Sequence, residues 1–349
     1  MANGNMVGCH EYYTSIGETA VASRYSGNAG TTTNPYAVED VFDLQKVYNR
    51  TGGGNNASFV LVKDVDYNDH PIKKYGISSG YLWGDVSTNY PYTFSGKDPL
   101  TGENHEIRNL IVLSNTVTCG LGTSAQNSKI KNINFVNMIL KDTTYNSNSS
   151  YYLWNKVPIS NCNFSIMFIN SSFGQFFGYS CNFTDCSFNI YGTNYVGSDV
   201  RTTYLFIGNS NTVLTRCHFN FNNFIITRIG SPTSYIFVGQ QENAPTPVKD
   251  CYFTGTIFIK NSSNYNVDIA WAVSLYSSYI ALTFSGEGGL GNIIMTTNAE
   301  SISFIDTDIL GTTITSGAGG ANLAKLTTAQ AKSYSYVSGI GFPVILAGD

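Results

Sequence analysis

The chain has 349 residues, of which 42% are hydrophobic and only 12% are charged, and its formal net charge is -4. Disordered chains carry few aromatic residues and many charges, so an aromatic content of 14% predicts a folded protein. No block of Lys or Arg occurs, which argues against a nucleic-acid groove. No apolar run approaches the ~20 residues that span a bilayer, so no membrane span is predicted.

Residues 1–35 are rich in Gly, Asn, Ser and Thr and show little hydrophobic periodicity, so we expect an extended N-terminal arm. The first five residues include no basic region and no apolar stretch follows them, so no signal peptide is predicted. An extracellular type of composition without an export signal is expected of a phage gene product, made in the host cytoplasm and released by lysis. The arm is then the segment expected to dock on other virion proteins.

Residues 36–58 are predicted to form a helical cap and a linker. Val38, Val41 and Leu44 follow a roughly helical spacing, Asn34-Pro35 is a plausible start, and the glycines at 52–54 end the helix. Stacked-repeat proteins need such a cap because the open end of the first repeat would otherwise expose unpaired strand edges.

Residues 59–325 carry a recurring pattern of polar residue, Cys, polar residue and Phe. Alternation with period two predicts strands with Cys and Phe on one face, and a repeat of about 30 residues built only from strands predicts coils stacked at ~4.8 Å. We therefore predict an all-β fold, a single right-handed parallel β-helix (solenoid) with an N-terminal arm and short helical caps. The predicted core ladder consists of Cys162, Phe164, Cys186, Phe188, Cys217, Phe219, Cys251 and Phe253.

A β-sandwich or barrel is the alternative fold, but sandwiches show turns every ~8–12 residues and do not repeat one side-chain identity at one register. Unequal spacing of the repeats suits a solenoid, because insertions loop out without disturbing the stack. The last unit, residues 326–349, is predicted to be a C-terminal cap with a short helix at its start.

Several motifs resemble those of β-helical surface and phage proteins that carry GLUG-type repeats. The strand Leu61–Asp66, the stretch Gly102–Val112 and the stretch Lys129–Leu140 follow the motifs of that family in order, and residues 326–342 are similar to the way many such proteins close. The resemblance implies a β-helix fold and a role at a cell or virion surface.

Carboxylates and histidines are candidate catalytic groups, because parallel β-helices include polysaccharide lyases and glycosidases. Asp64 and Asp66 lie two residues apart, a spacing that permits the carboxyl pair of a glycosidase. The resembling motif favours a hydrogen-bonding role in a turn for both, and a turn role is also expected for His105 beside Glu106. His218 lies between Cys217 and Phe219, so it is expected to face outward.

No metal or cofactor is predicted. The seven cysteines include no CxxC pair, and no Asp-rich calcium pattern occurs. Buried free thiols are the expected state of the Cys column. The sequence leaves enzymatic activity undecided but favours a protein without it.

Six aromatic residues in predicted loops are candidates for stacking on sugars or anchoring a partner protein. They are Trp83, Tyr90, Tyr92, Tyr151, Tyr152 and Trp154.

The functional expectation is a virion structural or attachment protein of a phage, such as a head fibre, a head decoration or a tail-associated β-helix. Its expected partners are other virion proteins, host-surface polysaccharide and further copies of itself in a homotrimer. Two alternatives stay open: a polysaccharide depolymerase on a β-helix, and a surface adhesin.

Overall fold

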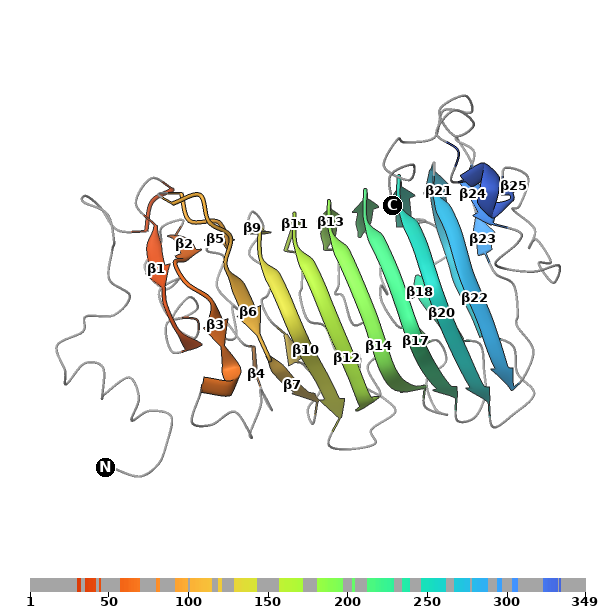
Figure 1. Ribbon diagram of the computed structural model, residues 1–349, viewed down its shortest axis with the longest axis horizontal. Helices are drawn as coiled ribbons and strands as arrows, with labels where there is room; N and C mark the ends of the chain where they lie inside the picture. Colours follow the sequence, from red (N-terminus) through yellow and green to blue (C-terminus); the bar gives the residue numbers. More distant parts are fainter. Residues whose placement is uncertain are drawn as a thin grey trace.

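The structure is a computed structural model, and most of it is an elongated row of parallel strands (Figure 1). It describes residues 30–32, 35–41, 44, 57–69, 80–81, 92–99, 101–114, 119–120, 129–142, 157–171, 181–196, 203–204, 212–228, 234–238, 246–261, 267–276, 278–287, 294–296, 303–306, 323–331 and 333. Nearly all of the predicted N-terminal arm lies outside these residues. No helix among them is long and apolar enough to cross a membrane.

Sheet A contains twelve strands within the described residues, and its spatial order starts at the N-terminal end of the row. The order is β1 (Tyr36–Val38), β2 (Ala57–Leu61), β5 (Tyr92–Ser95), β9 (Lys129–Lys131), β11 (Ile159–Ser160), β13 (Asn182–Thr184), β16 (Val213–Thr215), β19 (Thr246–Lys249), β21 (Val267–Tyr276), β18 (Ser234–Val238) and β15 (Thr203–Tyr204), with β23 (Ile294–Thr296) paired to β21.

Sheet B contains eleven strands of the described chain, and its order starts at the C-terminal end. The order is β25 (Leu323–Leu326), β24 (Ser303–Asp306), β22 (Tyr279–Glu287), β20 (Tyr252–Asn261), β17 (His218–Arg228), β14 (Ser187–Val196), β12 (Asn163–Ser171), β10 (Asn134–Asp142), β6 (Glu106–Arg108) and β3 (Val65–Asp66), with β7 (Ile111–Ser114) paired to β10. A small third sheet pairs β4 (Gly80–Tyr81) with β8 (Cys119–Gly120), and a 3-10 turn, η2 (Tyr67–Asp69), follows β3.

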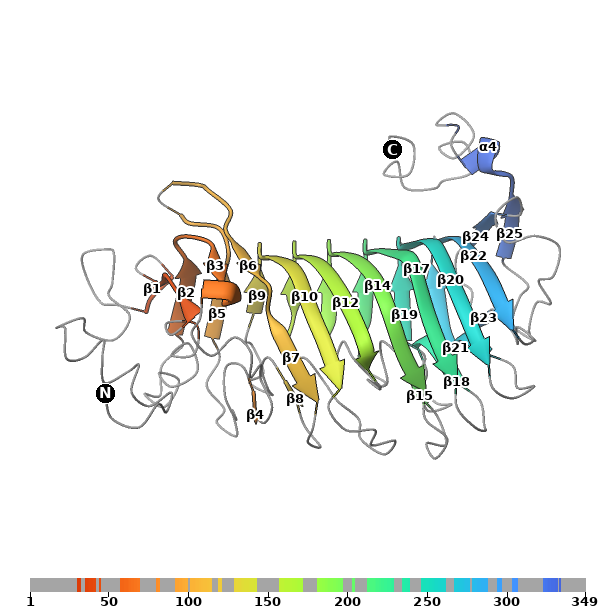
Figure 2. The same ribbon diagram turned by 60° about the horizontal axis from the view of Figure 1, so that its bottom comes forward.

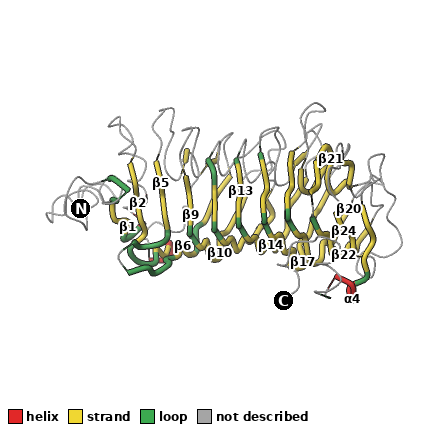
Figure 3. The backbone as a smooth tube through the Cα atoms, turned by 90° about the horizontal axis from the view of Figure 1, so that it is seen from above, coloured by secondary structure: helices red, strands yellow, loops and turns green. Residues whose placement is uncertain are grey.

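Five rungs repeat through the middle of the row, and each consists of a sheet A strand, a two-residue corner and a sheet B strand. They are β9–β10, β11–β12, β13–β14, β16–β17 and β19–β20. Neighbouring rungs pair in parallel, so that each sheet grows by one strand per rung (Figure 3). The structure is therefore all-β and built on long parallel sheets, as predicted.

The first corner residue of each rung has a left-handed backbone conformation, with φ between 50° and 57°. These residues are Asn132, Asn161, Asp185, Arg216 and Asp250. Asn and Asp tolerate this conformation better than other non-glycine residues, which explains why the pattern places a polar residue before each Cys. Arg216 is the exception, and its guanidinium donates two hydrogen bonds to the Asp185 carboxylate in the neighbouring rung, at 2.6 and 2.7 Å.

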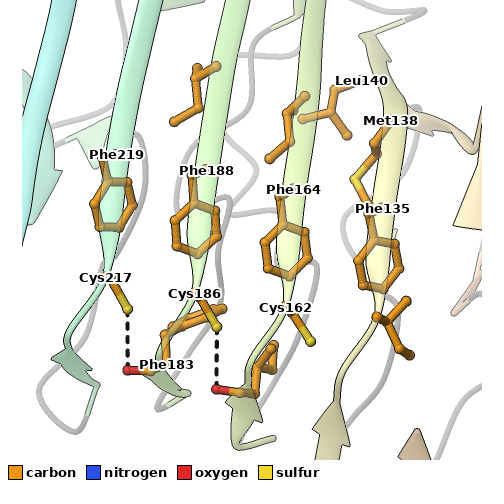
Figure 4. Packing of buried hydrophobic residues seen from close by; sticks show 14 of the residues in the cluster. Phe135, Met138, Leu140, Cys162, Phe164, Phe183, Cys186, Phe188, Cys217 and Phe219 are labelled. Atoms are coloured by element: carbon orange, nitrogen blue, oxygen red, sulfur yellow. Dashed lines mark hydrogen bonds between the residues drawn. The ribbon is translucent and has the colours of Figure 1, made fainter. Parts of the chain in front are cut away.

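The Phe residues of the repeat form a continuous buried column (Figure 4). Successive ring centroids from Phe135 to Phe253 lie 4.9, 4.9, 4.6 and 5.1 Å apart, with interplanar angles of 5° to 13°. The stacking follows from the register, which pairs each Phe with the Phe of the next rung. The three inner rings therefore bury both of their faces against like neighbours, and the two end rings bury one face in this way.

The prediction for residues 36–58 is wrong at both of its ends. Tyr36–Val38 form strand β1 instead of a helix, because they pair in parallel with Phe59–Leu61 and bury Val38 in the core. Strand β2 also begins at Ala57, inside the predicted linker. Val41 and Leu44 are helical and buried, and the amide of Leu44 donates to the carbonyl of Asp40, so one helical turn does follow β1.

The C-terminal cap contains a short helix, α4 (Thr328–Ala331), directly after β25 at the C-terminal end of the row (Figure 2). The hydroxyl of Thr327 accepts from the amide of Gln330, and the side-chain oxygen of Gln330 accepts from the amide of Thr327. This reciprocal pair is a capping box, which starts the helix at Thr328.

Gly192→Ala should unfold the stack locally, whereas Gly102→Ala should be tolerated. Gly192 has φ of 92°, and a Cβ there would lie well inside contact distance of the Phe168 carbonyl oxygen on the neighbouring strand. We expect a loss of at least about 3 kcal/mol of unfolding free energy for Gly192→Ala. Gly102 has φ of 74° but open space around it, so its change should cost about 1 kcal/mol. Urea titrations of both variants measure the difference, and equal losses would contradict the packing argument.

Candidate functional site

Charged side chains converge at the start of sheet B, where the turn after β2 meets β6. The Asp64 carboxylate accepts from the amide of Glu106 at 3.0 Å and lies 2.8 Å from the guanidinium of Arg108. Arg108 also donates to the Glu106 carboxylate at 2.8 Å. The hydrogen bond to Glu106, followed by the charge of Asp64, raises the pKa of Arg108 and holds it positive between the two acids.

Asp66, two residues further along the chain, closes a turn. Its Oδ1 accepts from the amide of Asn68 and from the side-chain amide of Asn109, both at 2.8 Å. Asn109 has φ of 55° and accepts in turn from the side chain of Asn137 in the next strand at 2.6 Å. This is the turn role that the sequence favours for Asp66.

His105 lies beneath the charged cluster and is 9% exposed. Its backbone amide donates to the carbonyl of Gly96 at 2.8 Å, and its Nδ1 lies 3.7 Å from Asp64. Its Nε2 is buried without a hydrogen-bond partner. The carboxylate of Asp64 that lies near the imidazole is already bound to Arg108.

Asp64, Asp66 and Glu106 thus all have partners within the protein, which suits the bracing of turns better than acid–base chemistry. Within the described part of the chain, no group of three or more His, Cys, Asp or Glu side chains is placed to hold a metal ion.

The Cys column lies beside the Phe column and consists of buried free thiols. Each thiol donates to the carbonyl of the residue two positions earlier, at 3.2 to 3.4 Å from Cys162, Cys186, Cys217 and Cys251. Burial raises the pKa of Cys162, Cys186 and Cys217. The column continues to Ser278, whose hydroxyl donates to the carbonyl of Val248 at 3.2 Å. The thiols are therefore packing groups that also satisfy backbone acceptors.

The outward face of sheet B carries a second set of columns, which the sequence analysis did not predict. The residue after each corner faces outward, in the series Asn134, Asn163, Ser187, His218 and Tyr252. Asn163 donates to Asn134 at 2.8 Å, and Ser187 donates to Asn163 at 2.5 Å. The sequence signal is present, since four of these positions stand between Cys and Phe in the repeat and Asn134 stands between Ile133 and Phe135.

His218 faces outward, as predicted, but it also has partners on the face. Its ring stacks on Tyr252 with centroids 4.1 Å apart, and its Nε2 lies 2.8 Å from the hydroxyl of Thr254. Thr254 donates to Asn220 at 3.3 Å, and Asn220 donates to Asn189 at 2.9 Å. Hydrogen bonds thus run along the stack on the outside, parallel to the columns inside.

An apolar column crosses this outward face. Its members are partly exposed. Met167 pairs with Ile139 and Tyr191, and after a shift of register in β14 Ile225 pairs with Thr193 and Phe258. The column consists of Ile139, Met167, Tyr191, Ile225 and Phe258. We call one part of this outward face the uncharged face. It consists of the outward residues of β10 from 134 to 140 and of the outward residues at the paired positions of β12, β14, β17 and β20. None of those described is Asp, Glu, Lys or Arg.

The structure describes the side chains of none of the six aromatic candidates. Tyr92 belongs to β5, but only its backbone is described. The others stand outside the described residues altogether: Trp83, Tyr90, Tyr151, Tyr152 and Trp154. Their role in binding stays a prediction.

Asp66→Ala should destabilise the protein by about 1–3 kcal/mol, because it leaves the amide of Asn68 and the side chain of Asn109 without their acceptor. Asp66→Asn keeps one acceptor oxygen and should lose less than half as much. Denaturant titration of both variants measures the loss. An equally small loss for both would contradict the turn role.

The thiols of Cys162, Cys186 and Cys217 should resist alkylation in the folded protein. The thiolate is the reactive form, and burial raises the pKa of all three groups, so at pH 8 each should react with iodoacetamide at least about 100-fold more slowly than free cysteine. Peptide mass spectrometry with and without guanidinium measures the rates. Fast labelling of these residues without denaturant would contradict the burial of the column.

Comparisons with known proteins give a likeness of fold. No family model matches the chain, and no curated protein matches it. A solved structure from Bacteroides ovatus, assigned provisionally as an immunoglobulin A1 protease, has 14% sequence identity and a TM-score of 0.50 over 79% of this chain and 84% of that one. At this identity the likeness concerns the course of the chain alone.

Proposed function

We propose that the five rungs belong to a single right-handed parallel β-helix, flanked by an N-terminal arm and short helical caps. Two features support this fold. Every pairing between neighbouring rungs is parallel, and each rung returns to the same two sheets one strand further along. Parallel strands of one sheet that are joined by a crossover are right-handed in about 98% of cases.

On this fold we propose a virion structural or attachment protein of a phage, located on the particle as a head fibre, head decoration or tail-associated component. The observation that carries the proposal is the unbroken stack, in which the Phe column and the outward hydrogen-bonded columns run through the same rungs. Such a stack is stiff along its length and presents a repetitive, weakly charged surface. These properties suit a spacer or fibre that positions other groups.

The proposed partners are those expected of a protein on the surface of a particle. Other virion proteins would hold the N-terminal arm, host-surface polysaccharide would contact the loop aromatics, and further copies of the chain would complete a homotrimer. The motifs that resemble those of GLUG-type repeat proteins would fit a surface role. The protease assignment of the Bacteroides ovatus protein is not part of the proposal, since the likeness to it is one of fold.

A polysaccharide depolymerase is the second candidate, and one observation favours it. Asp64 and Glu106 both contact Arg108, and His105 lies beside Asp64, so two carboxylates and an imidazole meet where the first strands of sheet B begin. Against it, Arg108 and a backbone amide already engage these acids. A reducing-end assay on host capsule, with Asp64→Asn as the matched variant, decides between a rod and an enzyme.

Antibodies raised against the chain should label intact particles in negative-stain micrographs of the source lysate. Density-gradient fractions should also contain the protein in the virion band at a fixed ratio to the capsid protein. The matched control is serum depleted on the purified chain, which should leave particles bare. Recovery of the protein only in the soluble fraction, with unlabelled particles, would refute the virion assignment.

A further inference from the structure

We propose that the uncharged face of sheet B is the surface on which a second copy of this chain docks, with the two stacks parallel. The proposal deepens the homo-oligomer part of the proposed function and rests on it. It is independent of whether the particle is a virion, because it is argued from the outward side chains of five strands.

The composition of the face is that of an interface core. The apolar column lies beside the lysine edge, and polar columns without formal charge fill the rest up to the corners. Exposed charges border the face at the corner edge (Asp185 and Arg216), at the opposite edge (Lys141 and Lys260) and on β6 beside β10 (Arg108). A patch free of charge with a charged rim matches the depletion of charged residues at the core of protein interfaces.

Polar groups on the face already have hydrogen bonds within the sheet. Asn163, Ser187 and Asn220 each donate to the neighbouring rung, and the hydroxyl of Tyr191 donates to the side chain of Asn137 at 3.2 Å. Covering a polar group is costly when it loses its partner to do so, and these groups keep theirs. The face can therefore be buried with little loss of polar solvation.

The size of the face suits association between copies. On strand β20 the face spans eight residues, 252–259, and at ~3.3 Å per residue and ~4.8 Å for each of five strands it covers about 600 Å². Two such faces in contact would bury about 1,200 Å² in total, at the lower limit of the ~1,200–2,000 Å² of standard stable interfaces. A small ligand would cover only a fraction of this area.

The edge charges select the parallel orientation. Rotation about an axis along the stack brings the corner edge of one copy against the lysine edge of the next. The corner edge of sheet B carries two acids, Asp185 and Asp250, and one base, Arg216, a net charge of -1 that would face the lysines of the partner's opposite edge. An axis along the strands would instead bring like edges together, with lysines opposite lysines. Opposite charges at the rim favour the first arrangement.

The first test measures the mass of the full-length chain by light scattering after size exclusion. Wild type should have a mass of at least twice 38.0 kDa. Met167→Glu, in the apolar column of the face, should weaken association at least tenfold and give monomers, with an unchanged circular dichroism spectrum. Val213→Glu is the matched control, since Val213 is a partly exposed apolar residue of sheet A, and it should leave the mass unchanged.

A monomeric wild type overturns both the oligomer and the docking face. An oligomer that survives Met167→Glu, or that is lost equally with Val213→Glu, overturns the face alone and leaves the homo-oligomer of the proposed function in place.

The second test addresses orientation. Lys141→Glu combined with Lys260→Glu makes both edges acidic, so association should weaken at about 0.02 M salt and recover at about 0.3 M, where charges are screened. Lys129→Glu combined with Lys249→Glu changes the net charge equally on exposed residues of sheet A and should have no effect. Unchanged association of the edge variant at low salt overturns the parallel arrangement.

Discussion

Parallel pairing in register is the constraint on which the rest of this structure depends. When each strand pairs with the same positions of the next rung, every side chain lies above its equivalent about 4.8 Å away. That distance matches the contact distance of stacked aromatic rings, so Phe164 and Phe188 can lie nearly parallel with centroids 4.9 Å apart. The rung spacing therefore falls within the range of centroid distances at which stacked rings attract one another.

The same constraint orders the outside. A side-chain amide has a donor and an acceptor on one plane, so Asn163 can donate to Asn134 and accept from Ser187 at the rung spacing. Charged residues cannot repeat in this way because like charges directly above one another repel. The low content of charged residues is thus a consequence of stacking, and the one basic residue in the corner column, Arg216, is placed above Asp185.

Sequence alone predicted the parallel sheets and the two inner columns, because Cys and Phe recur at one register and alternate with polar residues. It could not predict the corners, since a left-handed conformation at Arg216 depends on the ion pair with the neighbouring rung. The helix expected at Tyr36–Val38 is a strand because pairing with Phe59–Leu61 outweighs a weak helical periodicity. The charged cluster was visible only as separate motifs, as Asp64 and Glu106 are 42 residues apart in sequence and meet through strand pairing.

A stack has no intrinsic length, and this bears on function. Each rung adds similar contacts to its neighbours, so stability rises with every rung while the end strands stay exposed to further pairing. Strand β1 and its following helical turn place Val38, Val41 and Leu44 in the core at one end, and helix α4 follows β25 at the other. Association through the side of the stack would leave those ends in place. Side-by-side assembly on the uncharged face is therefore compatible with a rod of fixed length, whereas end-to-end pairing would yield filaments without a defined size.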